Sequence, residues 1–237
     1  MGHNYIMRIL NSLTHPTNKE TLFVFDLDST IFCVSPRTQQ ILRDLGAQSE
    51  FQEKYPEESK ILKEIETKPE DWGIRAALTR SGIRSTLEFF ETVRTFWVEH
   101  FFSSNYLHLD LPYEGAIEYL HQLDQAGAHL RYLTGRDSER MRKGTLKSFE
   151  QWKIPLKSGD DLIMKPRQGL KDEDYKVRYL KTFVGEFKSV YFFENEPLIL
   201  NKVREDVPEV QLVFMESVHS GKSTAPSGLP TLKMTYL

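Results

Sequence analysis

Short apolar runs followed by turn residues occur once near the start of the chain and repeatedly in its second half. These runs are LFVF (22–25), HLRYLT (129–134), DLIM (161–164), VYFF (190–193) and VQLVF (210–214). Amphipathic stretches of helical length lie between the later runs, over 113–126, 137–152 and 172–185. Strands that alternate with helices predict right-handed crossovers and a parallel sheet covered by helices on both faces. The pattern therefore predicts an α/β fold with a Rossmann-like, three-layer core.

The ends of these predicted helices carry the residues that usually stop or start a helix. Gly127 follows the first stretch, and glycine is favoured just past the last helical residue. Asp137 and Ser138 open the second stretch as candidate N-caps, because their side chains can accept a hydrogen bond from the first turn.

Residues 35–110 follow a different pattern, without a clean strand alternation. Helical segments are predicted at QQILRDLG (39–46), ESKILKEIE (58–66), WGIRAALTRSG (72–82) and STLEFFETVRTFWVEHFF (85–102). The sequence thus predicts an all-helical insertion over 35–110, with an α/β core made of 1–34 and 111–237. The tail 219–237 is rich in Ser, Gly, Pro and Thr and predicts an irregular loop.

Composition and charge exclude several classes of protein. The 237 residues are 39% hydrophobic and 27% charged, and the net charge of −3 gives no support to bulk nucleic-acid binding. Cys33 is the only cysteine, so no intramolecular disulfide can form. No apolar run approaches the roughly 20 residues that span a bilayer, and the first residues lack a secretory signal pattern. We expect a cytoplasmic protein without a membrane partner.

Polar residues follow four of the predicted strands, in FDLDST (25–30), YLTGRD (132–137), IMKPR (163–167) and FFENEP (192–197). Parallel strands bring these ends to one edge of the sheet, where ligands bind in such folds. Asp26, Asp28 and Glu194 offer the oxygen ligands that Mg²⁺ accepts. The sequence therefore predicts a magnesium site at this edge.

Two further groups at the same edge suit a phosphate. The hydroxyl of Thr134 and the flexible backbone at Gly135 can hold phosphate oxygens, and Lys165 supplies a positive charge. Lys157 and Lys171 lie nearby as alternatives to Lys165. A cation, a lysine and a carboxylate nucleophile are the parts that phosphoryl transfer requires.

These motifs resemble those of the haloacid dehalogenase superfamily of phosphohydrolases. The family's first motif, a hydrophobic strand followed by Asp-x-Asp and Thr, is similar to FDLDST, and its second is similar to Thr134 after a strand. Lys165 fits its third motif, and Glu194 corresponds to its fourth. The resemblance covers 20–34 and 111–216, while 35–110 resembles the family's C1 cap in location and helical character.

The resemblance implies a role for each of these residues. Asp26 would attack phosphorus and form an aspartyl-phosphate, and Asp28 would protonate the leaving oxygen and later deprotonate the hydrolytic water. Asp26, Asp28 and Glu194 would hold Mg²⁺, with Asn195 as a further ligand through a water. The expected substrate is a small phosphomonoester, because a cap over the site tends to exclude large ones.

The fourth motif departs from the family pattern, because Glu194-Asn195-Glu196 replaces the usual aspartates. Glu196 competes with Glu194 for the metal role. Pro197 gives a hint of phosphatases that act on nucleic-acid ends, which the acidic net charge opposes. A non-catalytic protein that binds a phosphorylated ligand, and a phosphomutase, also stay open. The sequence leaves the oligomeric state undetermined.

Overall fold

A computed structural model describes residues 20–237 of the chain; the first 19 residues, which the sequence assigns to the core, lie outside the described residues. Six parallel strands form one sheet in the order β5-β4-β1-β6-β7-β8. They are β1 (Thr21–Phe25), β4 (His129–Asp137), β5 (Leu162–Lys165), β6 (Ser189–Glu194), β7 (Gln211–Met215) and β8 (Thr231–Leu232). The predicted α/β class with a parallel sheet is confirmed, and the five predicted strands are β1, β4, β5, β6 and β7.

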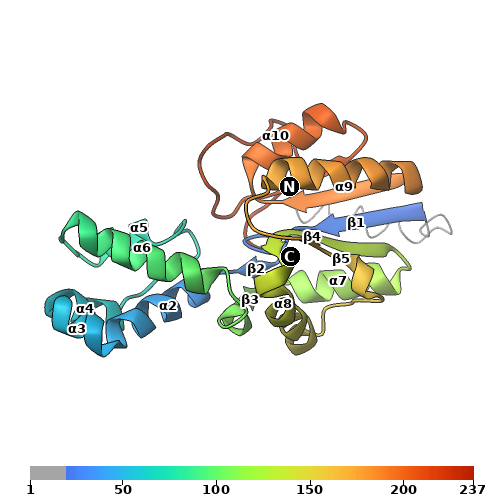
Figure 1. The fold of residues 1–237 in the computed structure, drawn as a ribbon. Helices are drawn as coiled ribbons and strands as arrows, with labels where there is room; N and C mark the ends of the chain where they lie inside the picture. The colour runs from blue at the N-terminus through green and yellow to red at the C-terminus, as the bar shows by residue number, and fades with distance from the viewer. Residues whose placement is uncertain (1–19) are drawn as a thin grey trace.

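Helices cover both faces of the sheet, and alternate residues of β1 show the division. Phe23 and Phe25 pack in the buried cluster that includes residues of α7 (Ala116–Gln125) and α8 (Ser138–Trp152). Leu22 and Val24 point to the other cluster, under α9 (Asp172–Glu186) and α10 (Pro197–Asp206). Figure 1 shows the sheet between these two pairs of helices. A short 3-10 turn, η3 (Gly159–Asp161), precedes β5.

Five helices follow one another between residues 35 and 101. They are α2 (Ser35–Ala47), α3 (Ser49–Lys54), α4 (Pro56–Lys63), α5 (Arg75–Arg80) and α6 (Leu87–Phe101), followed by the 3-10 turn η2 (Leu107–Leu109). Their buried side chains, among them Leu42, Leu62 and Phe89, form a cluster of their own. The antiparallel strands β2 (Phe32–Cys33) and β3 (Leu111–Pro112) lie where the chain enters and leaves this segment. In Figure 1 the five helices stand beside the sheet.

Helix ends follow the local chemistry of the sequence. The Asp137 side chain caps α8 by accepting a hydrogen bond from the backbone N–H of Arg140 at 2.9 Å, as predicted. Gly127 has a φ of 82°, the conformation for which glycine is favoured after a helix. The helix predicted from 113 starts at Ala116 instead, because Gly115 has a φ of 75° and forms the N-cap.

The tail is more ordered than its composition predicts. Residues 219–230 form the predicted irregular loop, but Thr231–Leu232 supply β8, and the N–H of Phe214 donates to the carbonyl of Pro230 at 2.9 Å. The Tyr236 hydroxyl is buried and donates to the backbone carbonyl of Thr30 at 3.1 Å. A strand of two residues is too short to show an alternating pattern, so the sequence gives no signal of it. The tail thereby supports the loop that follows β1.

Across the described residues, no helix combines the length and the apolar character needed to cross a membrane.

Close packing of α2 against α4 depends on the absence of a side chain at Gly46. A Cβ atom there would lie 2.8 Å from the Cβ of Leu62 and 3.0 Å from the carbonyl of Ser59. Gly46→Ala is therefore expected to lower the free energy of unfolding by about 1–3 kcal/mol, the usual effect of overpacking. The matched change Gly185→Ala, in α9 with open space around it, should be neutral or stabilising. Chemical denaturation of both variants measures the difference; equal stabilities would contradict this packing.

Candidate active site

The loop after β1 places Asp26 at the carboxyl end of the central strand. The backbone N–H of Asp26 still donates to the carbonyl of Phe193 in β6 at 3.0 Å, so the residue keeps the register of the sheet. The chain then turns tightly, with a φ of 61° at Ser29 and a hydrogen bond from the Ser29 N–H to the Phe32 carbonyl at 2.7 Å. Two further side chains of this turn, Asp28 and Thr30, lie close to the same edge.

Lys176 joins the carboxylates of Asp26 and Glu194. Its Nζ lies 2.7 Å from Oδ1 of Asp26 and 2.6 Å from Oε2 of Glu194. All three side chains are almost fully buried. The other oxygen of Glu194, Oε1, accepts from the backbone N–H groups of Asn195 and Glu196, both at 2.9 Å. The strand ends of β1 and β6 and the start of α9 thus meet in one charged group.

This group carries more negative than positive charge, since one ammonium faces two carboxylates. Burial is the main cause that raises the pKa of Asp26 to about 7; Lys176 lowers it, and the carboxylate of Glu194 raises it again. Burial lowers the pKa of Lys176, but the two carboxylates outweigh it and the pKa is raised. A bound cation or a protonated Asp26 would relieve the excess negative charge.

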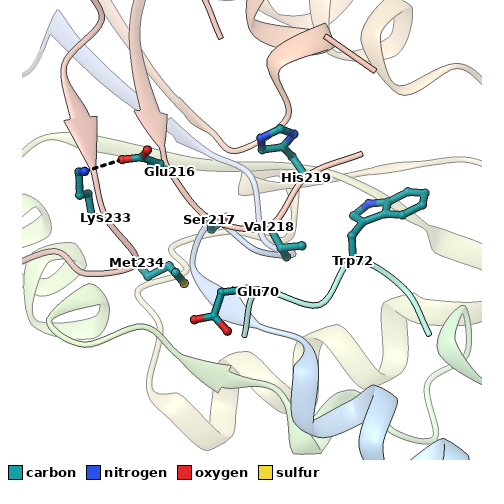
Figure 2. A pocket seen from close by; sticks show the side chains of 8 residues that line it. All are labelled: Glu70, Trp72, Glu216, Ser217, Val218, His219, Lys233 and Met234. Carbon is teal, nitrogen blue, oxygen red and sulfur yellow. Dashed lines mark ion pairs between the residues drawn. The ribbon is translucent and has the colours of Figure 1, made fainter. Parts of the chain in front are cut away.

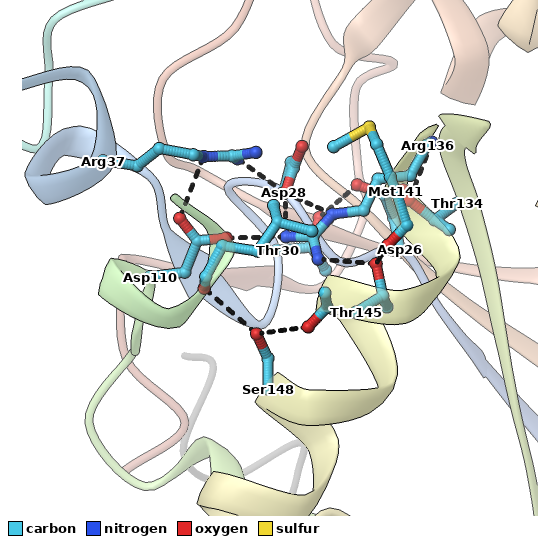
Figure 3. A network of polar contacts seen from close by, with 12 residues as sticks. Asp26, Asp28, Thr30, Arg37, Asp110, Thr134, Arg136, Met141, Thr145 and Ser148 are labelled. Carbon is cyan, nitrogen blue, oxygen red and sulfur yellow. Dashed lines mark hydrogen bonds and ion pairs between the residues drawn. The ribbon is translucent and has the colours of Figure 1, made fainter. Parts of the chain in front are cut away.

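Asp28 faces a different set of partners, shown in Figure 3. Its Oδ1 accepts from Nη2 of Arg37 at 3.1 Å and from Nε and Nη2 of Arg136 at 3.0 and 2.5 Å. Both arginines also pair with the fully buried Asp110, at 3.0 and 2.7 Å. Burial raises the pKa of Asp28, but the positive charges and hydrogen bonds of the arginines outweigh it and lower the pKa to about 2. Asp28 is therefore held as a carboxylate.

Thr134 and Gly135 lie at the carboxyl end of β4, beside the loop after β1 in the sheet. Thr134 is buried, and its Oγ1 accepts from the backbone N–H of Arg136 at 3.3 Å. Gly135 permits a close approach, because a Cβ there would lie 2.6 Å from a carboxylate oxygen of Asp172. Both residues lie at the predicted edge of the sheet, and their contact with a phosphate stays a prediction.

Lys165 lies at the predicted strand end, where it pairs with an acidic side chain, and its contact with a phosphate stays a prediction. It forms an ion pair with Asp172, the first residue of α9, and donates to the carbonyl of Leu170 at 3.2 Å. The structure brings Lys176, not Lys165, to Asp26. A signal was present in the sequence: Lys176 occupies the same helical stripe as Leu180 and Phe183, where a lysine interrupts an otherwise buried face.

Asn195 links the site to two neighbouring loops. Oγ1 of Thr30 lies 3.2 Å from Oδ1 of Asn195 and 3.5 Å from Oδ2 of Asp26. Nδ2 of Asn195 donates to the carbonyl of Val218 at 2.7 Å. Glu196 turns away from this group, because its carboxylate accepts from the N–H and the hydroxyl of Ser220 at 2.9 and 2.8 Å. Of the two glutamates, Glu194 alone contacts Lys176.

The set of three carboxylates expected for magnesium is not assembled. Among residues 20–237, no three histidine, cysteine, aspartate or glutamate side chains gather into a group that could hold a metal. Asp26 and Glu194 share Lys176, but the carboxylate of Asp28 is taken by Arg37 and Arg136. The sequence could not show this, because the two arginines come from distant segments. Arg37 belongs to α2 and Arg136 to the end of β4.

A pocket of about 430 Å³ opens beside the loop after β1 (Figure 2). Glu70 and Trp72 line it from the chain between α4 and α5, and Val218 and His219 line it from the chain after β7. Ser217, also in the lining, donates to the carbonyl of Ser29 at 2.5 Å. The side chain of Trp72 is largely exposed. The pocket therefore lies between residues 70–72, which belong to the helical stretch 35–110, and the chain that follows β7 and β8.

Comparison with known proteins gives a family and a fold. A family model described as haloacid dehalogenase-like hydrolase matches residues 21–197. No curated protein matches the chain. Among solved structures, Protein Tyrosine Kinase A of Mycobacterium tuberculosis is similar with a TM-score of 0.54 and 14% identity, over 92% of this chain and 95% of that one. A Had-superfamily hydrolase from Ehrlichia chaffeensis is similar with a TM-score of 0.47 and 16% identity, over 84% and 90%.

Proposed function

Because the chain belongs to the haloacid dehalogenase-like hydrolases, we propose that it hydrolyses phosphomonoesters through a covalent phosphate on Asp26. The observation that carries this proposal is the buried carboxylate of Asp26 at the end of the central strand, with the ammonium of Lys176 2.7 Å from it. A carboxylate beside a fixed positive charge can attack phosphorus while the charge of the phosphoryl oxygens is stabilised.

The reaction has two steps. In the first, a carboxylate oxygen of Asp26 bonds to phosphorus and the bond from phosphorus to the leaving oxygen breaks. That oxygen leaves as an anion when it is an aryl oxygen, and otherwise takes a proton from solvent water. In the second, water attacks phosphorus and gives its proton to Asp28, while the bond from phosphorus to Asp26 breaks and inorganic phosphate leaves. Thr134 and the backbone at Gly135 would hold the phosphoryl oxygens between the two steps.

The contacts of Asp28 favour the second step. A carboxylate held ionised by two arginines is in the protonation state that a base requires, whereas it carries no proton to supply to a leaving group. Substrates whose leaving oxygen departs without a proton, such as aryl phosphates, should therefore suit this site best.

We propose that Asp26 and Glu194, which now share the ammonium of Lys176, would be the two protein carboxylates for a magnesium ion. Mg²⁺ is commonly held by one or two carboxylates together with water and substrate phosphates, and Asp26 and Glu194 form a buried group with excess negative charge. When bound, Mg²⁺ would neutralise charge on the phosphoryl oxygens. Asn195, whose amide lies beside Thr30, would support it through a water.

Binding of Mg²⁺ is expected to release protons from the free protein. Since the pKa of Asp26 is raised to about 7, part of this carboxyl is protonated at neutral pH, and a cation would favour its ionised form. Titration calorimetry at pH 7 in two buffers of different ionisation enthalpy should report on the order of half a proton released per site. Glu194→Gln should weaken this binding. Binding of Mg²⁺ without proton release would argue against Asp26 as a ligand.

The helical segment, residues 35–110, would act as a cap that selects small substrates. It contributes Glu70 and Trp72 to the pocket, while the sheet side contributes Val218 and His219. The pocket is joined to the turn after β1 through Ser217, which lines it and donates to the carbonyl of Ser29. Its charged lining is Glu70 and the ion pair between Glu216 and Lys233, so it offers no excess of positive charge to a long polyanion such as a nucleic-acid end.

Hydrolysis of a panel of phosphate esters, with and without Mg²⁺, tests this function. Turnover of 4-nitrophenyl phosphate and of small phosphorylated metabolites is expected, with Mg²⁺ required. A folded protein that binds inorganic phosphate and Mg²⁺ but turns over none of these esters would support the binding-protein alternative instead.

A further inference from the structure

Four charged side chains around Asp28 form a compensated network at the junction of the helical segment and the sheet. Arg37 and Arg136 face Asp28 and Asp110, so two positive charges meet two negative ones. Arg37, Arg136 and Asp110 are almost completely buried, whereas the Asp28 side chain keeps 28% exposure. The one member of the network with an open face is therefore the one that points into the site.

Arg37 contacts both places where the chain passes between the sheet and the helical segment, after β2 and before β3. It lies in the first turn of α2, just after the chain leaves β2. Its Nη1 donates to the carbonyl of Phe101 at the end of α6 at 3.1 Å, and its guanidinium lies 3.9 Å from the centre of the Phe101 ring. Its Nε pairs with Asp110, which directly precedes β3. One side chain thus touches the end of α6, Asp110 and Asp28. Figure 3 shows Arg37 with Asp28 and Asp110.

Arg136 holds Asp28 from the sheet side. It lies in β4, in the irregular stretch between Thr134 and Asp137, and its Nη1 donates to Oγ1 of Thr145 in α8 at 3.2 Å. All hydrogen bonds from the two arginines to Asp28 reach the same oxygen, Oδ1. The second oxygen, Oδ2, takes no part in these bonds and lies on the partly exposed side chain.

We propose that Arg37 and Arg136 are positioning residues that clamp Oδ1 of Asp28, so that Oδ2 is aimed at the water that hydrolyses the phosphoenzyme. This inference rests on the proposed function. Because Arg37 belongs to α2, the placement of the whole helical segment sets the orientation of Asp28. Neither arginine touches Asp26, so the clamp acts on the release of phosphate from Asp26 and leaves the attack of Asp26 on phosphorus intact.

The test separates the two steps with 2,4-dinitrophenyl phosphate, whose leaving group needs no proton. The double variant Arg37→Met with Asp110→Asn removes one charge of each sign, so the network stays balanced. Steady-state kcat should fall about 10²-fold, the usual contribution of a positioned base, while the rate of the first dinitrophenolate burst changes little. Acid-quenched protein should carry close to one covalent phosphate per site. Asp28→Asn should behave in the same way.

Arg43→Met is the matched control, because Arg43 lies on the same helix but donates to the backbone carbonyl of Ile65 at 3.1 Å, inside the helical segment. It should leave both rates unchanged. If the double variant does not fold, Arg37→Lys decides, because lysine keeps the charge but cannot reach three partners with one planar group. Arg37→Lys should lower kcat about tenfold and raise the fraction of protein that carries covalent phosphate after acid quenching.

Burst and steady-state rates that fall together, or no change in either, would overturn the positioning role. Failure of the proposed function would look different. In that case the unaltered protein would not turn over the ester, and Asp28→Asn would accumulate no covalent phosphate.

Discussion

Replacing Asp26 by Asn is expected to lower kcat/KM for phosphate esters by about 10⁴-fold or more, the scale seen when a residue of the covalent machinery is removed. Asparagine has nearly the same shape and can still accept the hydrogen bond of Lys176, so the surroundings should stay in place. It cannot attack phosphorus as a carboxylate does. Asp174→Asn is the matched control, because Asp174 is exposed on α9 and lies 3.7 Å from Lys202. It should retain full activity.

The same substitution should change stability in a way that depends on pH. The pKa of Asp26 is raised from 3.8 to about 7 in the folded chain, so the folded state holds a proton that the unfolded state has already released. Ionising Asp26 therefore reduces the free energy of unfolding progressively as pH rises from about 4 to 7. Asp26→Asn escapes this loss, and its stability relative to the unaltered protein should increase over that interval. A difference that is constant with pH would contradict the raised pKa.

If Asp26→Asn lost its activity because it no longer folds, the nucleophile would not be identified. The thermal unfolding of the variant is therefore measured together with its activity. A folded Asp26→Asn protein that still hydrolyses esters would place the nucleophile elsewhere and defeat the proposed mechanism. Covalent phosphate should form on the unaltered protein and be absent from the variant.

The sequence predicts the framework well because burial leaves a strong pattern. Residues 22–25 are apolar without interruption, as expected for a central strand covered on both faces, and the structure places them as β1 in the middle of the sheet. Parallel strands also bring their carboxyl ends together by necessity, so Asp26, Thr134 and Glu194 could be assigned to one edge without knowledge of any contact.

The partners of these residues could not be predicted, since they depend on where side chains from distant segments arrive. Lys165 follows an apolar run directly and so seemed the natural cation, yet a strand end fixes only the backbone and its lysine reaches Asp172. Arg37 lies in a helix with no apparent relation to the site, and only the return of the chain through Asp110 brings it to Asp28. Position along a strand is local information, whereas pairing between charges is not.

Lys176 should be the lysine on which activity depends. Lys176→Met removes the ammonium that faces Asp26 and Glu194 and is expected to lower kcat/KM by about 10²–10³-fold, the range found when one preorganised charge-stabilising group is lost. Lys165→Met is the natural comparison, because its ammonium pairs with Asp172 at the start of α9 and does not reach Asp26. Its activity should fall by less than about tenfold, through a looser start of α9.

Removing Lys176 also leaves two buried carboxylates without their cation, which can cost about 3–5 kcal/mol of stability. Lys176→Arg keeps the charge and so separates loss of charge from loss of fold: it should unfold at a higher temperature than Lys176→Met and recover part of the activity.

Without the ammonium, the pKa of Asp26 should rise further, because Lys176 is the nearest group that lowers it. The acid limb of the kcat/KM profile should then move to higher pH in Lys176→Met and stay in place in Lys165→Met. If Lys165→Met lost more kcat/KM than a folded Lys176→Met, the phosphate-binding role would belong to Lys165, as the sequence predicts.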